Sequence, residues 1–241
     1  MVSDVRQSAR DAIVVAMTAA AREFSARSDI PLWLVVAPVL LLVAGLVAVR
    51  FDVPAVRWLD GGHLPGSLGK AISISEAFTH GIGVAVIVAL VWLLDRFHRA
   101  GVVRIALGTI AAGTLADLGK LLVGRTRPRY LPDAATSLDT FTGWIPDGMY
   151  AAHQSFPSGH AAIGFALAVL LSWHYPAGRP VFIGLAILGA LQRIVSGLHY
   201  PSDVLVGAAV GCACALAFLP GGVIGRRLSP LDARLAPRLQ Q

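Results

Sequence analysis

Residues 31–49 read PLWLVVAPVLLLVAGLVAV, an apolar run of 19 residues with no charged side chain. A helix needs about 20 apolar residues to cross the hydrocarbon core of a bilayer, so this run is predicted to span a membrane. The whole chain agrees, because its 241 residues are 56% hydrophobic and only 14% charged, with a mean hydropathy of +0.69. Soluble domains carry about 25% charged residues. The composition therefore excludes a soluble globular domain, and it excludes a disordered chain as well.

Five further apolar stretches follow the first. The second to sixth predicted spans cover residues 71–94, 102–123, 157–173, 180–198 and 201–219. The last three have short apolar cores and reach spanning length only if polar residues extend their ends. We therefore expect an all-α, polytopic membrane protein. Its six transmembrane helices would form one domain over residues 29–220, with the polar motifs in the part from about 70 to 219.

The two ends of the chain lie outside this domain. Residues 1–28 contain a ten-residue apolar stretch, AIVVAMTAAA, with charged residues on both sides. The stretch is too short to span and is predicted to form an amphipathic helix at the membrane surface. A secretory signal peptide is the alternative, although Asp4 and Asp11 do not suit its basic leading region. Residues 221–241 are expected to form a basic cytoplasmic tail.

The positive charges predict the orientation. The chain has 20 Lys and Arg against 14 Asp and Glu. With the N-terminus inside, 12 of these cations lie in inner segments and eight in outer ones, and five of the outer eight belong to the cluster described next. This bias favours a bacterial inner-membrane protein with both termini in the cytoplasm. Because the charges are scattered between apolar runs, no nucleic-acid partner is expected.

Three polar motifs interrupt the apolar pattern. They are Lys120-x6-Arg127-Pro128, Pro157-Ser158-Gly159-His160 and Arg193-x5-His199-x3-Asp203. With six spans, all three fall at helix ends on the outer, periplasmic side of the membrane. Charged groups at membrane depth are costly and usually functional. The sequence therefore predicts that the three motifs form one site.

The charge of this cluster indicates an anionic ligand. Its charged residues are one acid and three cations, namely Asp203, Lys120, Arg127 and Arg193. This composition suits phosphate, because lysine supplies a point charge and arginine a planar fork for phosphate oxygens. No metal ion or other cofactor is expected.

The second motif is predicted to open a helix that faces the phosphate. Pro157 suits a first helical turn, and the backbone N–H groups of Ser158, Gly159 and His160 are expected to face outward. Gly159 would let the backbone approach the phosphate closely, and Ser158 would add its hydroxyl.

Two histidines complete the group of residues predicted to carry out phosphoryl transfer. Of His160 and His199, one can attack phosphorus while the other, protonated, delivers a proton to the leaving oxygen. Asp203 lies four residues after His199 and would accept the second ring N–H of His199, which would fix the tautomer of the ring.

Taken in order, the three motifs resemble those of the type 2 phosphatidic acid phosphatase family of membrane lipid phosphatases, which share their pattern with soluble vanadium haloperoxidases. The resemblance implies that His199 is the nucleophile, that Asp203 orients it and that His160 protonates the leaving group. It further implies a phosphate site, made of Lys120, Arg127, Ser158, Gly159 and Arg193. One departure is Gln192, where the family usually has serine.

The predicted function is a metal-independent phosphatase that acts at the outer face of the membrane and removes phosphate from a lipid phosphate or diphosphate through a phosphohistidine. Undecaprenyl diphosphate, phosphatidylglycerol phosphate, phosphatidate and a lipid A phosphate all fit as substrates. A lipid phosphotransferase using the same phosphohistidine stays open. A non-catalytic transporter fits less well, because it would not need two histidines and an aspartate together. The oligomeric state is unknown from sequence.

Several other polar residues receive weaker interpretations. Arg125 and Arg129 are interpreted as solvated or headgroup-facing charges rather than ligands. Glu76 and His80, one turn apart, are interpreted as a packed polar pair, with substrate contact as the alternative. His153 could line the entrance to the site.

The connection of residues 128–156 is long for a segment between two helices. Long loops without regular structure are often lids or binding loops. Trp144 and Tyr150 suit the membrane interface, so this loop is a candidate lipid gate.

Overall fold

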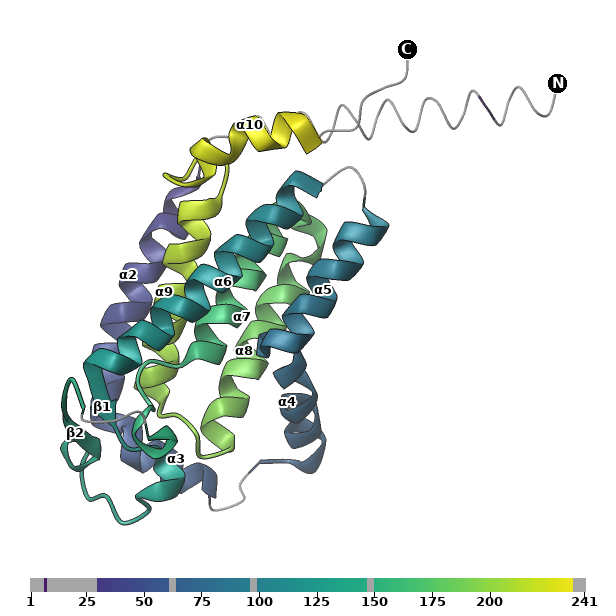
Figure 1. The fold of residues 1–241 in the computed structure, drawn as a ribbon. Coiled ribbons are helices and arrows are strands. Elements are labelled where there is room, and N and C mark those ends of the chain that lie inside the picture. Colours follow the sequence, from purple (N-terminus) through teal and green to yellow (C-terminus); the bar gives the residue numbers. More distant parts are fainter. Residues whose placement is uncertain (1–6, 8–29, 61–63, 96–98, 147–149, 236–241) are drawn as a thin grey trace.

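The computed structural model describes residue 7 and residues 30–60, 64–95, 99–146 and 150–235. The amphipathic helix predicted within residues 1–28 lies outside the described residues. The described chain is a bundle of helices that run side by side (Figure 1). A small β-hairpin and a short helix cover one end of the bundle, and another short helix lies across the opposite end. The expectation of a helical protein is confirmed, with this hairpin as an addition.

Within the described residues, four helical stretches are long and apolar enough to cross a membrane. They are Leu32–Asp60, Arg99–Leu122, Pro176–Val195 and Pro201–Phe218. A fifth candidate consists of α4 (Gly66–Thr79) and α5 (Gly81–Leu94), which are bent by 68° relative to each other. The remaining apolar helix, α7 (Gly159–His174), has only 16 residues. The six predicted spans are therefore not confirmed.

The bend between α4 and α5 occurs at His80. This residue leaves the helical conformation, with φ −88° and ψ 138°, and becomes the N-cap of α5. Its Nδ1 accepts a hydrogen bond from the N–H of Ile82 at 3.3 Å. A capping side chain replaces the acceptor that a helix start lacks. The apolar pattern of residues 71–94 continues through this point, so hydropathy alone predicts one straight helix.

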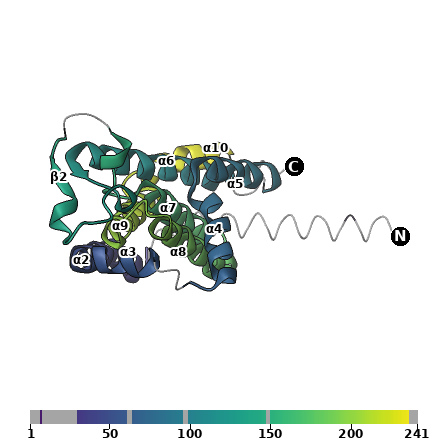
Figure 2. The same ribbon diagram turned by 90° about the horizontal axis from the view of Figure 1, so that it is seen from below.

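The central helix of the bundle is α7. It lies among α6 (Arg99–Leu122), α8 (Arg179–Val195) and α9 (Pro201–Phe218) (Figure 2). Its buried side chains point in all directions, and they include Ala161, Ala162, Ala166, Leu167, Leu170 and Leu171. A helix that is apolar all round is stable only when other helices surround it. On the outside, α2 (Leu32–Ala48) packs along α9.

Two glycines of α9 allow it to approach α7 closely. A Cβ atom on Gly207 would lie 2.3 Å from the carbonyl oxygen of Ser158, and one on Gly211 would lie 2.2 Å from that of Ala162. The approach brings the starts of both helices together, and the N–H of Ser158 donates to the carbonyl of Asp203 at 3.0 Å. The second and third motifs are therefore joined by backbone contacts.

Gly211→Ala should destabilise the protein, because the added methyl group would force α7 and α9 apart. The expected loss is about 1–3 kcal/mol, as for other overpacked sites, and thermal unfolding in detergent measures it. Gly184→Ala is the matched control, since Gly184 is a helical glycine of α8 with nothing within 4 Å of its added Cβ. Equal unfolding temperatures for the two variants would contradict the close packing.

The end of the bundle that carries the motifs has its own short elements. After α2, a 3₁₀ turn (Val49–Phe51) leads into α3 (Asp52–Asp60). The connection from α6 to α7, which carries the end of the first motif, contains β1 (Val123–Arg125) and β2 (Phe141–Trp144), which pair antiparallel. Further 3₁₀ turns in the chain are Pro128–Tyr130, Leu138–Thr140, Ala151–His153 and Pro176–Gly178. The described part of the 128–156 connection is therefore largely ordered by short elements.

The opposite end of the bundle is covered by α10 (Gly225–Leu235), which lies within the predicted basic tail (Figure 1). Arg104 of α6 fixes the connection to it, because its Nη1 donates to the carbonyls of Phe218 and Gly225 at 3.0 and 2.9 Å. Pro230 lies inside α10. Proline usually ends a helix, which explains why the sequence pattern did not indicate one here.

Candidate active site

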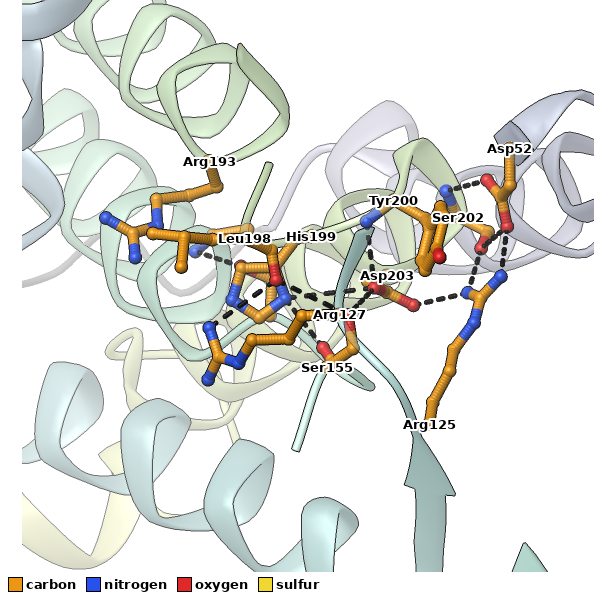
Figure 3. Close-up of polar contacts among 12 residues, drawn as sticks. Asp52, Arg125, Arg127, Ser155, Arg193, Leu198, His199, Tyr200, Ser202 and Asp203 are labelled. Carbon is orange, nitrogen blue, oxygen red and sulfur yellow. Dashed lines mark hydrogen bonds and ion pairs between the residues drawn. The ribbon is translucent and has the colours of Figure 1, made fainter. Parts of the chain in front are cut away.

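The three motifs meet at the end of the bundle next to α3 and the hairpin. Lys120 lies in the last turn of α6, Ser158 caps α7, and His160 lies in its first turn. The α8–α9 connection supplies His199. Arg127 follows β1. In Figure 3 the ring of His199 lies between Arg127 and Arg193 on one side and Asp203 on the other.

His199 is placed by a left-handed turn after α8. Gly197 has a φ of +64°, a conformation that glycine adopts without steric cost. The turn lets the N–H groups of Leu198 and His199 both donate to the carbonyl of Arg193 at 3.1 Å. The His199 side chain is thereby buried, with 2% of its surface exposed.

The tautomer of His199 follows from one contact. Its Nδ1 lies 2.6 Å from the backbone carbonyl oxygen of Ser155, and a carbonyl can only accept. Nδ1 must therefore carry the proton, which leaves the lone pair on Nε2. Burial lowers the pKa of His199 below its ordinary value of 6.5, against the opposing effect of Asp203. The ring is therefore neutral at pH 7, the state in which Nε2 is a nucleophile.

The expected hydrogen bond between His199 and Asp203 is not formed. Asp203 Oδ2 lies 3.8 Å from His199 Nδ1, which is beyond hydrogen-bond distance. This oxygen instead accepts from the hydroxyl of Ser155 at 2.6 Å and from the N–H of Tyr200 at 2.9 Å. Asp203 thus caps α9, and it reaches His199 through Ser155. Ser155 donates to the aspartate with its hydroxyl and accepts from the histidine with its carbonyl.

Each of the three predicted phosphate-binding cations is held by a neighbour. Arg127 Nε donates to the carbonyl of Ala151 at 2.8 Å, and Arg193 Nη1 donates to Glu76 at 2.7 Å. Lys120 Nζ lies 2.7 Å from Asp117, the pairing that the spacing of the two residues allowed. A Cβ on Gly159 would lie 3.4 Å from Lys120 Nζ, so this lysine sits at the start of α7.

The start of α7 differs in two respects from the expectation. Pro157 lies before the helix rather than in its first turn, and Ser158 is the N-cap. The N–H of Ser158 is bonded to Asp203 and does not face outward, because α9 approaches so closely. Gly159 and His160 occupy the first two helical positions, whose N–H groups have no acceptor within the helix. These two groups provide the positive helix end that suits an anion.

His160, the second residue of α7, has a ring with charged and aromatic neighbours. Its Nε2 is buried and makes no hydrogen bond to any described residue. The ring lies within electrostatic range of Lys120, Arg193 and His199. His80 is a second neighbour, with ring centroids 5.6 Å apart. His160 therefore has an unused ring nitrogen among the cations, where a substrate oxygen would need a proton.

Glu76 and His80 do not form the mutual pair that the sequence suggested. Glu76 binds Arg193, and it accepts from Gln192 Nε2 at 3.1 Å, while His80 faces His160. The bend at His80 turns the two side chains toward different partners. Gln192 also accepts from Arg193 Nη1 at 3.0 Å. The glutamine at the position of the family's serine therefore helps to hold the arginine.

The interpretation of Arg125 as a solvated or headgroup-facing charge was wrong, and its contacts include Asp52, a residue that the sequence analysis did not identify. Arg125 is 6% exposed rather than solvated, whereas Arg129 is exposed as expected. Its guanidinium binds Asp203 Oδ1 at 2.5 Å and Asp52 Oδ2 at 2.6 Å. No signal in the sequence pointed to Asp52, because it lies outside every motif and 73 residues before its partner.

His153, the last residue of a 3₁₀ turn, pairs with Thr126 at 3.0 Å.

Comparisons with known proteins identify the family to which the motif-bearing region belongs. Residues 101–222, which include all three motifs, match the PAP2 superfamily. Lipid A 1-phosphatase of Rhizobium etli is 38% identical over 103 residues, which are 42% of this chain and 42% of that protein. Decaprenylphosphoryl-5-phosphoribose phosphatase of Mycobacterium tuberculosis is 37% identical over 148 residues, 61% of this chain and 76% of that protein.

The fold has a solved counterpart. The crystal structure of Aquifex aeolicus LpxE matches with a TM-score of 0.54, over 68% of this chain and 92% of that chain, at 22% identity. This identity shows a likeness of fold alone. The chain spans less than half the length of the Rhizobium etli relative. Because the superfamily match covers half of the chain and contains all three motifs, the protein belongs to the PAP2 superfamily.

Proposed function

We propose that the protein is a metal-independent phosphatase that removes phosphate from a lipid phosphate or diphosphate. The observation that carries the proposal is the contact of His199 Nδ1 with the Ser155 carbonyl at 2.6 Å. It leaves Nε2 unprotonated, on the side of the site where Arg127 and Arg193 lie (Figure 3). A nucleophile beside two guanidinium groups suits phosphoryl transfer, in which the protein positions the phosphoryl group and stabilises its charge.

The proposed reaction has two steps. His199 Nε2 attacks phosphorus, and the bond from phosphorus to the lipid oxygen breaks while His160 gives that oxygen a proton. Water then attacks the phosphohistidine, with His160 taking a proton from the water, and phosphate leaves. The three cations would stabilise the equatorial oxygens in both transition states. They are Lys120, Arg127 and Arg193.

The apolar helices and the names of the relatives support a lipid as the substrate. The relatives named above act on a lipid A and on a decaprenylphosphoryl compound, and both present a phosphate at the end of long apolar chains. Undecaprenyl diphosphate, phosphatidylglycerol phosphate, phosphatidate and lipid A phosphates belong to the same chemical class. The proposal is therefore limited to this class.

The distribution of arginines supports an active site on the outer face of a bacterial inner membrane. Among the described cations outside residues 120–129 and Arg193, six lie on elements at the α10 end of the bundle, against three at the motif end, namely Arg50, Arg57 and Lys70. The six are Arg99, Arg104, Arg179, Arg226, Arg227 and Arg234. By the positive-inside rule, this distribution supports a cytoplasmic location for the α10 end. The motif end would face the periplasm.

Phosphate release by the detergent-purified protein tests the proposal. With EDTA present, we expect release from at least one of the four lipids. We also expect inhibition by vanadate, which mimics five-coordinate phosphorus and should bind on the order of 100-fold more tightly than inorganic phosphate. Release that depends on added Mg²⁺ would contradict the mechanism. Transfer of the phosphate to a sugar or lipid hydroxyl, without release, would identify a phosphotransferase instead.

A further inference from the structure

Asp52 is a buried carboxylate that the mechanism above does not use. It begins α3, outside the three motifs and outside the region matched by the superfamily. None of its surface is exposed. Its Oδ1 accepts from the N–H of Ser202 at 2.9 Å, and its Oδ2 accepts from the Ser202 hydroxyl and from Arg125 Nη2. These three donors, one of them a guanidinium, favour the ionised form of the carboxylate against the cost of burying its charge.

Arg125 connects this carboxylate to the catalytic aspartate. Its Nη1 donates to Asp203 Oδ1 and to the hydroxyl of Ser202, and its guanidinium lies 4.2 Å from the ring centroid of Tyr200. Its Nε donates to Thr140 at 3.0 Å. Figure 3 shows the resulting order, which runs from Asp52 through Arg125 and Asp203 to Ser155 and His199.

The charges of Asp52, Arg125 and Asp203 do not cancel. Two buried carboxylates share one guanidinium, so the group carries a net charge of −1. Without Asp52, Arg125 would neutralise Asp203 completely. With Asp52 present, Arg125 compensates two carboxylates at once, so part of the negative charge of Asp203 stays uncompensated. This remaining charge acts on the ring of His199. That ring becomes positive when Nε2 bonds to phosphorus, because Nδ1 keeps its proton.

We propose that Asp52 is a positioning residue for phosphoryl transfer, which balances Arg125 so that Asp203 stabilises the positive charge that develops on His199. This inference rests on the proposed function. It adds a residue from α3 to a site that the motifs place only on α6 to α9. A purely structural role for Asp52 would change the stability of the fold but not the electrostatic behaviour of His199.

Asp52→Asn tests the proposal, because it keeps the size of the side chain and removes the charge. We expect kcat to fall on the order of tenfold, with KM little changed, as one unit charge is lost at an effective dielectric constant of about 20. Asp60→Asn is the matched control, since Asp60 ends the same helix and is exposed. Its kinetics should match those of the wild type.

The pKa of His199 provides a readout that a structural role would not move. Four charged or titratable groups face the ring, namely Asp203 from α9, Arg127 from the β1 connection, Arg193 from α8 and His160 from α7. Asp52→Asn leaves these in place and removes a negative charge behind Asp203. The pKa of His199 should therefore fall, and the acid limb of kcat/KM should move to lower pH.

NMR of protein labelled at the histidine rings, with the His199 signal assigned by its loss in His199→Ala, measures that pKa without any substrate. An inactive wild type with a lowered His199 pKa in Asp52→Asn would overturn the proposed function while confirming the electrostatic link. An active wild type whose kcat and His199 pKa are both unchanged in Asp52→Asn would overturn the inference alone.

Ser202→Ala covers the case in which Asp52→Asn does not fold. This variant removes one hydroxyl that bonds to both Asp52 and Arg125 and leaves all the charges in place. We expect kcat to fall about threefold, because the contribution of one neutral hydrogen bond is smaller than that of a charge. An unchanged kcat in Ser202→Ala, together with an Asp52→Asn variant that cannot fold, would assign Asp52 a structural role and overturn the proposal.

Discussion

His199→Ala is expected to lower lipid phosphate release by at least about 10⁴-fold, because the variant has no atom that can form the phosphoenzyme. The fold should survive, since His199 makes one side-chain hydrogen bond, to the carbonyl of Ser155. Phosphate release from the most active lipid measures the effect. When turnover of a lipid with a labelled phosphate is quenched with alkali, the labelled phosphate should remain bound to the wild-type protein and not to the variant.

His174→Ala is the control for this prediction. His174 is a buried histidine at the far end of α7 from the motifs, so its loss tests whether removing any buried histidine lowers activity. We expect this control to retain turnover per folded molecule. If His199→Ala kept wild-type turnover in pure, folded protein, the nucleophile would have to be a different residue.

Arg125→Met is expected to destabilise the protein by about 3–5 kcal/mol, the cost of removing one partner from a buried ion pair. Here the loss leaves two carboxylates, Asp52 and Asp203, buried without their shared cation. Methionine keeps much of the side-chain volume, so the effect is mainly electrostatic. Thermal unfolding in detergent should show a decrease on the order of 10 °C.

Arg129→Met is the matched control for Arg125→Met. Arg129 is exposed, and its guanidinium contacts the ring and hydroxyl of Tyr130. Its replacement should change stability by no more than about 0.5 kcal/mol. The double variant Arg125→Met with Asp52→Asn should be less destabilised than the sum of the two single variants, because the same contact is removed twice. Equal unfolding temperatures for Arg125→Met and Arg129→Met would contradict the buried network.

Features that depend on neighbours along the chain could be predicted from the residues alone. Apolar run length predicted helices at residues 31–49, 102–123 and 201–219 because lipid as a solvent leaves the backbone few other structures. Motif spacing correctly indicated the superfamily, and it placed His199 and Asp203 on either side of a helix start. The pairing of Lys120 with Asp117 is equally local, since residues three apart are neighbours on a helix.

Tertiary structure alone decided the features that depend on distant segments. The same apolar pattern covers a straight helix and the helix broken at His80, because hydropathy does not record where a cap forms. Arg125 and Arg129 look alike in sequence, yet one is buried against Asp52 and Asp203, which are 73 and 78 residues away. Ser155 contacts both His199 and Asp203, which are 44 and 48 residues away along the chain. A buried ion pair forms where the packing of helices removes water, and no local pattern of residues contains that information.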